Sequence, residues 1–295
     1  MRQNDCSVRE RVEAGLAGAV ASVCQETGLA EARLYSLLAG GKRLRPRMML
    51  AAGAMLGAQE AKAMPFALAL EMIHTYSLIH DDLPAMDNDT LRRGRPTSHV
   101  VFGEAQAILA GDALLNGAFE LMSRACLEAD EQSREGSLRA MSAIAGAAGG
   151  QGMIRGQWLD IAATDGAITR QQLETLHLNK TGALFCAAVK AGGHLAGADA
   201  DTLDRLADYG RAFGMVFQMT DDILDVSGDP ARLGKSVGKD AQEHKCTYVT
   251  LLGLEVTRQM AAEYCGKAKD ALAPFSGPEK QWLCGLADSL LDRDH

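Results

Sequence analysis

The sequence predicts an all-α protein whose helices form a bundle around a central cavity. Alanine, leucine, methionine and glutamate are abundant, and apolar residues recur at helical spacing along the whole chain. No alternating strand pattern of useful length is present. Two aspartate-rich segments, which begin at Asp81 and Asp221, have the same order of parts. This repetition favours a bundle that presents two similar faces to one cavity.

The composition indicates one well-cored domain spanning residues 1–295. Apolar residues make up 47% of the chain and charged residues 23%, and no linker-like segment divides it. The net charge of −8 argues against a general nucleic-acid binder, so an anionic ligand must be bound by local basic clusters. The seven cysteines have no paired spacing, which indicates reduced thiols and no zinc site.

We expect a cytoplasmic protein without membrane insertion. The apolar segment 14–24 follows several arginines, as a secretory signal would, but Asp5, Glu10 and Glu13 interrupt that pattern. An amphipathic first helix is therefore expected. No apolar run approaches the roughly 18 residues that a membrane span requires.

Glycine and proline predict where the helices are interrupted. Breaks are expected at residues 40–41, 57–59, 84–96, 128–136, 164–168, 192–199, 227–239 and 275–278. Segment 149–160 is glycine-rich within a helical pattern, where each glycine costs roughly 1 kcal/mol relative to alanine. Either another helix or a ligand chain is expected to lie close against this backbone.

Segment 71–96 places acidic side chains directly before basic ones. The acidic residues are Asp81, Asp82, Asp87 and Asp89, and the basic ones are Arg92, Arg93 and Arg95. Carboxylates this close repel one another unless a cation lies among them. Mg²⁺ binds a few carboxylates together with water and substrate phosphates, and arginines can hold the rest of such a phosphate group. The segment therefore predicts a divalent-metal site for a phosphorylated ligand.

The local geometry of this segment can also be predicted. His74 and Asp81 lie on one face of a helix. Asp87 would point nearly the opposite way if the helix continued, but Pro84 removes a backbone donor and disfavours helix at the preceding residue. We expect the helix to end there and the chain to curl back, so that Asp81 and Asp87 can share a metal.

Residues 40–47 read GGKRLRPR and predict an anion site. The glycines, Gly41 among them, let the backbone approach a ligand closely, and Pro46 suits a helix start, where free backbone N–H groups favour anions. Lys42 and Arg45 would add side-chain donors. A solvated basic turn is the alternative. Lys180 and Thr181, within a later apolar run, are weaker candidates for phosphate ligands, because a lone lysine there usually extends to solvent.

Segment 213–225 repeats the acidic pattern. Asp221 and Asp225 lie on one helix face, with Gln218 one turn earlier and Asp222 displaced to the side. Like charges at this spacing destabilise a bare helix, and the apolar neighbours indicate that this helix faces the core, so a cation is expected here as well. Basic residues follow again, at Lys235, Lys239 and Lys245.

Together these motifs resemble those of the trans-isoprenyl diphosphate synthases, and most nearly the short-chain bacterial type that makes farnesyl diphosphate. The likeness runs from Ala32 to Gly253 and rests on GGKRLRP at 40–46, HDDLPAMDND with LRRG at 80–94, KTG at 180–182, and FQMTDDILD with GK at 217–235. The two aspartate motifs and the intervening basic motifs are specific in combination. The sequence departs from the family pattern at Thr90, Trp158 and Val249, and its tail, 292–295, lacks a terminal lysine.

The resemblance implies an all-α homodimer with a deep cavity that binds three Mg²⁺ ions and condenses isopentenyl diphosphate with an allylic diphosphate. By position, the metal ligands would be Asp81, Asp82, Asp87, Asp221, Asp222 and Asp225. Isopentenyl diphosphate would be bound by Lys42, Arg45, His74 and Arg93, and the allylic diphosphate by Arg92, Lys180, Thr181, Gln218 and Lys235, with Gly41 and Lys245 as further contacts. Catalysis would depend most on Asp81, Asp87, Asp221, Lys180 and Lys235.

Tyr76, with its neighbour Ser77, is the expected determinant of product length. Tyr76 lies five positions before Asp81, which corresponds to about 7.5 Å along a helix. Helical spacing alone favours simple core packing of its ring. The resemblance instead implies a gate that stops the growing chain at farnesyl diphosphate, with geranylgeranyl diphosphate as the alternative product.

Three other functions were weighed. A terpene cyclase would share the helical fold and an aspartate-rich metal site but would not need the motif at 40–46. A non-catalytic partner subunit of a prenyl synthase would be expected to have lost one aspartate motif, whereas this chain retains both. A di-iron carboxylate bundle would require Glu-x-x-His pairs on facing helices, which we take to be absent.

Overall fold

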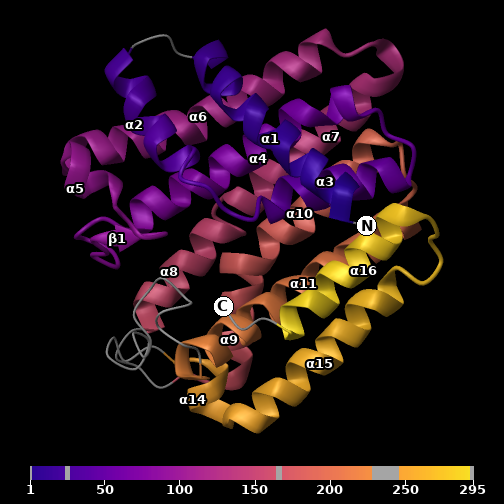
Figure 1. Ribbon diagram of the computed structural model, residues 1–295. Coiled ribbons are helices and arrows are strands. Elements are labelled where there is room, and N and C mark those ends of the chain that lie inside the picture. Colours follow the sequence, from indigo (N-terminus) through magenta and orange to yellow (C-terminus); the bar gives the residue numbers. More distant parts are fainter. Residues whose placement is uncertain (1, 24–26, 164–167, 228–245, 293–295) are drawn as a thin grey trace.

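A computed structural model describes residues 2–23, 27–163, 168–227 and 246–292, and it confirms the all-α prediction (Figure 1). The helices are α1 (Arg2–Val23), α2 (Thr27–Leu37), α3 (Leu44–Met55), α4 (Glu60–Asp81), α5 (Ser98–Phe102), α6 (Glu104–Glu128), α7 (Glu131–Ala148), α8 (Met153–Ala163), α9 (Arg170–His177), the π-helix η1 (Leu178–Gly182), α10 (Ala183–Leu195), α11 (Ala200–Ser227), α14 (Tyr248–Leu252), α15 (Leu254–Ala271) and α16 (Pro278–Leu291). Two short strands, β1 (Leu91–Arg92) and β2 (Arg95–Pro96), form an antiparallel hairpin.

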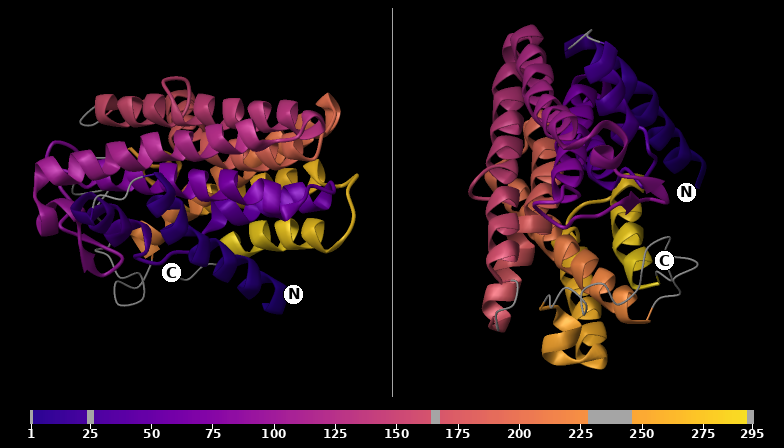
Figure 2. Two further views of the ribbon diagram at one scale, coloured as in Figure 1. Left: turned by 90° about the horizontal axis from the view of Figure 1, so that it is seen from above. Right: turned by 90° about the vertical axis from the view of Figure 1, so that its left-hand side faces the viewer.

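The long helices lie roughly along a common direction (Figure 2). Helix α4 packs against α6 and α3, and α10 packs against α3, α7 and α11, while α15 covers the other side of α11. The hairpin follows α4 in the chain, and α14 is the first described helix after α11; both lie on the left-hand side of Figure 1. The bundle therefore directs the aspartate-rich ends of α4 and α11 toward one side of the molecule. No helix among the described residues is long and apolar enough to cross a membrane.

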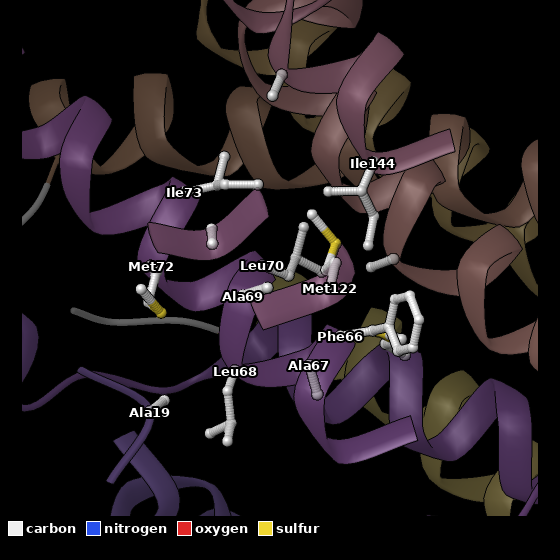
Figure 3. Packing of buried hydrophobic residues seen from close by; sticks show 14 of the residues in the cluster. Ala19, Phe66, Ala67, Leu68, Ala69, Leu70, Met72, Ile73, Met122 and Ile144 are labelled. Carbon is white, nitrogen blue, oxygen red and sulfur yellow. The ribbon is translucent and has the colours of Figure 1, made fainter. Parts of the chain in front are cut away.

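Helix α4 lies in the middle of the largest apolar core. Its side chains Phe66, Leu70 and Ile73 are almost completely buried, and Figure 3 shows them among Met122 of α6 and Ile144 of α7. Burial on this scale contributes roughly 1.5–3 kcal/mol for each large apolar side chain. Helix α4 is therefore held firmly by the core, and the acidic residues at its C-terminal end have a rigid support.

Close contact between helices accounts for the glycines of segment 149–160. A Cβ atom on Gly156 of α8 would lie 2.1 Å from the backbone nitrogen of Lys180 in η1. From the other side, a Cβ atom on Gly214 of α11 would lie 2.6 Å from the Cα atom of Gly182. Of the two partners expected for this segment, another helix is the one found. The backbone of η1 is thus packed tightly between α8 and α11.

Most expected breaks are confirmed, but one is shorter than expected, and the described residues contain three further breaks. The break at 128–136 shrinks to two residues, because the Asp130 side chain accepts a hydrogen bond from the Ser133 backbone N–H and starts α7 early. Further breaks were not expected: they lie at Gly149–Gly152 between α7 and α8, at Gly103 between α5 and α6, and at Gly253 between α14 and α15. The breaks at 164–168 and 227–239 fall largely outside the described residues.

Candidate active site

The chain folds back directly after the C-terminal end of α4. The helix ends at Asp81, and the backbone N–H of Asp87 donates a hydrogen bond of 2.9 Å to the Asp81 carbonyl oxygen. Asn88 takes a left-handed conformation, with φ of 49°, which asparagine tolerates well. The predicted helix end before Pro84 and the return of Asp87 to Asp81 are therefore confirmed.

The Asp81 carboxylate lies in surroundings that disfavour its negative charge. Burial is the main cause that raises the pKa of Asp81 to about 6, and the neighbouring Asp87 and Asp82 act in the same direction. Lys180 of η1 and Arg92 of the hairpin oppose this shift through their positive charges. A further cation beside Asp81 would relieve the remaining repulsion.

Arg92 acts as a counter-charge for the next aspartate. Its Nε atom lies 2.7 and 2.9 Å from the two carboxylate oxygens of Asp82, and its Nη2 atom lies 3.7 Å from a carboxylate oxygen of Asp89. The hairpin turn at Arg93 and Gly94 has positive φ at both residues, as a type I′ turn requires. This tight turn directs Arg92 toward the end of α4.

Arg93, at the tip of the hairpin, packs on the glycine loop before α3. Its Nη1 atom donates a hydrogen bond to the Gly40 carbonyl oxygen, and a Cβ atom on Gly41 would lie 3.0 Å from its Nη2 atom. Gly41 also has a φ of 133°, which side-chain-bearing residues rarely adopt. The group that lies close to Gly41 is thus the Arg93 guanidinium, and the expected approach of a ligand to this glycine stays a prediction.

The four cations of segment 40–47 divide into two kinds. Arg43 is buried and forms an ion pair of 2.7 Å with Glu71 on α4. Arg47 is also buried and donates a hydrogen bond of 2.7 Å to the Lys42 carbonyl oxygen. The Lys42 side chain is exposed, and Arg45 is the second residue of α3, within its first turn. Arg43 and Arg47 therefore shape the loop that presents Lys42 and Arg45.

Arg45 and His74 lie in a partly buried region that is rich in positive charge. Burial lowers the pKa of Arg45 to about 10, and the negative charges of Glu71 and Asp221 oppose that shift. Burial and then the positive charges of Arg45 and Arg93 hold the pKa of His74 well below its ordinary value, so this imidazole is neutral at physiological pH. The influence of Asp221 on Arg45 shows that the second aspartate segment faces the first basic one.

Lys180 and Thr181 lie on the π-helix η1, a rare element that is frequently found at functional sites. The Lys180 ammonium group forms an ion pair with Asp160 of α8. The sequence had not indicated Asp160 as a site residue. The signal that could have found it is Gly156 four residues earlier, because this glycine allows the η1 backbone to lie against α8.

The second aspartate segment is fixed by hydrogen bonds from neutral groups. Gln218 donates from its side-chain amide to one carboxylate oxygen of Asp222, at 2.9 Å, and the Tyr248 backbone N–H donates to the other, at 2.8 Å. Thr181 donates to Gln218 in turn, at 3.2 Å. Asp222 is buried and connects α11 with α14, so its observed contacts are structural, and its role as a metal ligand stays a prediction.

The remaining acidic and basic candidates can be placed only in part. Asp221 is partly exposed and Asp225 is buried. Lys235, Lys239, Lys245 and the end of the tail, 293–295, lie outside the described residues. The departure Trp158 lies on α8 with 74% of its surface exposed, which argues against a packing role for its ring in this chain.

The carboxylates suit a hard divalent cation that takes part of its ligand set from a substrate. Among the described residues, no three His, Cys, Asp or Glu side chains form a ready-made metal-binding group. Asp81 and Asp87 nevertheless lie across one bend and interact as like charges. Mg²⁺ commonly uses one or two carboxylates and completes its coordination with water and phosphate oxygens.

Tyr76 lies deeper along α4 and belongs to the largest apolar core. Its ring is 6% exposed and meets the His80 ring edge-on, with the centroids 5.6 Å apart, and burial raises the pKa of its hydroxyl to about 12. His80 lies against Gly111, where a Cβ atom would come within 2.2 Å of its Nε2 atom. The Ser77 hydroxyl donates to the His74 carbonyl oxygen. Core packing of Tyr76 is thus observed, and its role as a gate stays a prediction.

The sequence does contain Glu-x-x-His pairs, contrary to our expectation. They are Glu71 with His74 and Glu174 with His177. Glu71 forms its ion pair with Arg43, and Glu174 accepts a hydrogen bond of 2.8 Å from the Tyr264 hydroxyl. Neither pair belongs to a metal-binding group within the part of the chain that is described. The di-iron alternative therefore gains no support.

The chain is similar throughout to known prenyl synthases. A family model described as polyprenyl synthetase matches residues 26–272. The farnesyl diphosphate synthase of Geobacillus stearothermophilus is 42% identical over 291 residues, which cover 97% of this chain and 96% of that protein. The chloroplastic heterodimeric geranylgeranyl pyrophosphate synthase large subunit 1 of Arabidopsis thaliana is 45% identical over 268 residues, which cover 90% of this chain and 72% of that protein.

A solved structure agrees with these relatives. The crystal structure of a polyprenyl synthase from Caulobacter crescentus CB15, complexed with calcium and isoprenyl diphosphate, matches with a TM-score of 0.84 at 30% identity. The match covers 99% of this chain and 97% of that one. Both sequence and fold therefore lead to the same conclusion: the chain belongs to the polyprenyl synthetase family and is a short-chain prenyl diphosphate synthase.

Proposed function

We propose that this prenyltransferase condenses isopentenyl diphosphate with dimethylallyl and then geranyl diphosphate, and releases farnesyl diphosphate. Similar relatives include both a farnesyl and a geranylgeranyl synthase, at 42% and 45% identity, so overall likeness does not favour either product. The observation that carries the proposal is Tyr76, a bulky buried ring five positions before Asp81 on the same helix. Such a ring would obstruct a prenyl chain that extends along α4 from the acidic end.

The basic residues supply two regions for two diphosphates. We assign isopentenyl diphosphate to Lys42, Arg45, Arg93 and the neutral His74, because the charges of Arg45 and Arg93 both act on His74. We assign the allylic diphosphate to the region of Lys180, where the η1 cation lies near the end of α4. Arg92, Thr181 and Gln218 would complete that second region, together with Lys235. Each charge-assisted hydrogen bond to phosphate contributes about 1.5–3 kcal/mol.

We infer that the metal is Mg²⁺, with three ions in each active site. Asp81 and Asp87, with Asp82 nearby, would hold two of the ions. Asp221, with support from Asp222 and Asp225, would hold the third. The chemistry that bound Mg²⁺ supplies is neutralisation of the diphosphate leaving group. The calcium in the related Caulobacter crescentus structure supports a divalent ion at such a site. Full turnover in excess chelator would contradict this assignment.

The reaction then needs no protein nucleophile. The allylic carbon–oxygen bond breaks, its electron pair leaves with diphosphate, and the double bond of isopentenyl diphosphate attacks the resulting carbocation. Lys180, paired with Asp160, would hold the departing group through its positive charge. The last proton would pass to the released diphosphate, because His74 is a poor base with its pKa held low by burial and neighbouring arginines.

We further propose that two copies of the chain form a homodimer. The surface of α5 and the first half of α6 exposes several large apolar side chains, namely Val100, Val101, Ile108 and Leu109. Apolar side chains gathered on one surface commonly mark a protein interface. Sedimentation equilibrium would test the assembly, and a monomer at micromolar concentration would contradict it.

The product assignment is tested by replacing Tyr76. Purified enzyme is incubated with Mg²⁺, isopentenyl diphosphate and each allylic diphosphate in turn, and the products are sized by chromatography. We expect farnesyl diphosphate from the wild type and from Tyr76→Phe, which keeps the ring, and longer products from Tyr76→Ala. The proposal fails if Tyr76→Ala is active but still stops at fifteen carbons. A wild type that makes mostly twenty-carbon product would favour the geranylgeranyl alternative.

A further inference from the structure

Glu71 is a buried carboxylate placed among the cations of the isopentenyl diphosphate region. It lies on α4 one turn before His74, and its Oε1 atom accepts a hydrogen bond of 2.7 Å from Nη1 of Arg43. The two side chains are only 3% and 1% exposed. A charge is stable at such a depth only when it is paired. Glu71 is therefore part of the electrostatic structure of the site.

Arg43 uses its donors on the protein itself. Its Nη2 atom donates to the Leu37 carbonyl oxygen at 2.7 Å, and its Nε atom lies 3.6 Å from a carboxylate oxygen of Glu13 on α1. Its backbone is left-handed, with φ of 49°, an uncommon conformation for a residue other than glycine. Arg43 thus joins α1, α2 and α4, and these bonds direct its guanidinium away from a ligand.

Glu71 also acts on the two arginines that we assign to the ligand. Burial lowers the pKa of both Arg45 and Arg93. The negative charge of Glu71 is the largest influence that opposes this shift in each of them. Arg93 in turn has its pKa lowered by the positive charge of Arg43. Three guanidinium groups therefore surround one fully buried carboxylate. Without Glu71 the buried Arg43 would lose its buried partner, and the three guanidinium groups would repel one another.

We propose that Glu71 is the internal counter-anion of the isopentenyl diphosphate site. It holds Arg43 directly and keeps Arg45 and Arg93 together in the absence of diphosphate, as a positioning residue that never touches the substrate. The inference rests on the proposed function of this site. The charge of Glu71 stabilises the ligand-free enzyme and weakens the binding of an anion, because like charges repel through the same region.

The test measures the binding of inorganic diphosphate to metal-free enzyme, by calorimetry and by thermal unfolding. Glu71→Gln keeps an acceptor for Arg43 and removes only the charge. We expect a lower melting temperature without ligand and a diphosphate dissociation constant about three- to ten-fold smaller than that of the wild type. Glu60→Gln is the matched control, since Glu60 lies on the same helix and forms an exposed ion pair with Arg11. This control should bind diphosphate as the wild type does.

The outcomes separate this inference from the proposed function. A wild type that does not bind diphosphate contradicts the assignment of the site. A wild type that binds, with a folded Glu71→Gln that binds equally or more weakly, overturns the counter-anion role. If Glu71→Gln does not fold, Arg43→Gln and the double variant Arg43→Gln/Glu71→Gln give the same test. The first should bind diphosphate several-fold more weakly, and the second should return to within about twofold of the wild type; a double variant as weak as Arg43→Gln overturns the inference.

Discussion

The two aspartate clusters share a sequence pattern but are held by different chemistry. At the end of α4, both oxygens of Asp82 contact Arg92, whose side chain is 33% exposed. At the end of α11, the oxygens of Asp222 accept hydrogen bonds from the Gln218 amide and from the backbone N–H of Tyr248, which is fully buried. A partly exposed arginine can change partners, whereas a buried backbone N–H cannot. Asp82 can therefore exchange its protein cation for a ligand, whereas the hydrogen bonds of Asp222 are part of the scaffold.

The largest expected effect is the same for both clusters, because each contains a proposed metal ligand. Asp81→Ala and Asp221→Ala should each reduce turnover by orders of magnitude, because both residues are proposed metal ligands and metal ions neutralise the leaving group. The helical content should not change, since removing one carboxylate from such a cluster relieves repulsion. Steady-state kinetics with matched circular dichroism spectra would measure both. Near-normal turnover in both variants would show that the metal assignment is wrong.

Features that depend on nearby residues could be predicted from the sequence. The end of α4 before Pro84 and the return of Asp87 toward Asp81 follow from local backbone chemistry, and both are observed. The break at 40–41 likewise depends on the glycines themselves. The resemblance to the family further predicted that the acidic and basic motifs belong to one active site. Local rules and motif order were thus sufficient for the fold class and for the main site segments.

Features that depend on distant partners could not be predicted in this way. Arg43 and Arg45 have the same charge and are two positions apart, yet only Arg43 meets Glu71, which belongs to another helix. Asp222 differs from Asp221 because it accepts a hydrogen bond from the backbone N–H of Tyr248 in α14, a residue 26 positions later in the sequence. In each case the tertiary contact decides which of two equivalent residues becomes structural.

A second prediction compares the stabilising roles of the two clusters. Asp222→Ala should lower the free energy of unfolding by about 1–3 kcal/mol, because it leaves the buried Tyr248 N–H without an acceptor. Asp82→Ala should have the smaller effect, since the partly exposed Arg92 can regain water or turn toward Asp89. Urea unfolding of the two metal-free variants measures the difference. The reverse order of stability would contradict the contrast between an exchangeable cluster and a scaffold.

The smallest expected effect concerns the pH dependence of the first cluster. The folded protein raises the pKa of Asp81 to about 6, from an ordinary value of 3.8, mainly through burial. Between these two values the folded, metal-free protein retains a proton that the unfolded chain has lost. The contribution of Asp81 to the free energy of unfolding is therefore fully present below pH 4. It decreases as the pH rises toward 6 and stays lower above pH 6. Solvent access and the Lys180 charge limit the effect to about 1 kcal/mol.

Asp81→Asn removes this titration and should show it directly. Without metal, the variant should be more stable than the wild type at pH 7.5, and the two should be equal near pH 4. Added Mg²⁺ should reverse the order at pH 7.5, because only the ionised wild-type carboxylate gains a cation, and this gain should fade as the pH falls below about 6. Thermal unfolding across the pH range, with and without Mg²⁺, provides the comparison. A variant less stable than the wild type at pH 7.5 without metal would mean that the buried carboxylate is already satisfied by Lys180 and Arg92, and the electrostatic case for a metal at this cluster would be lost.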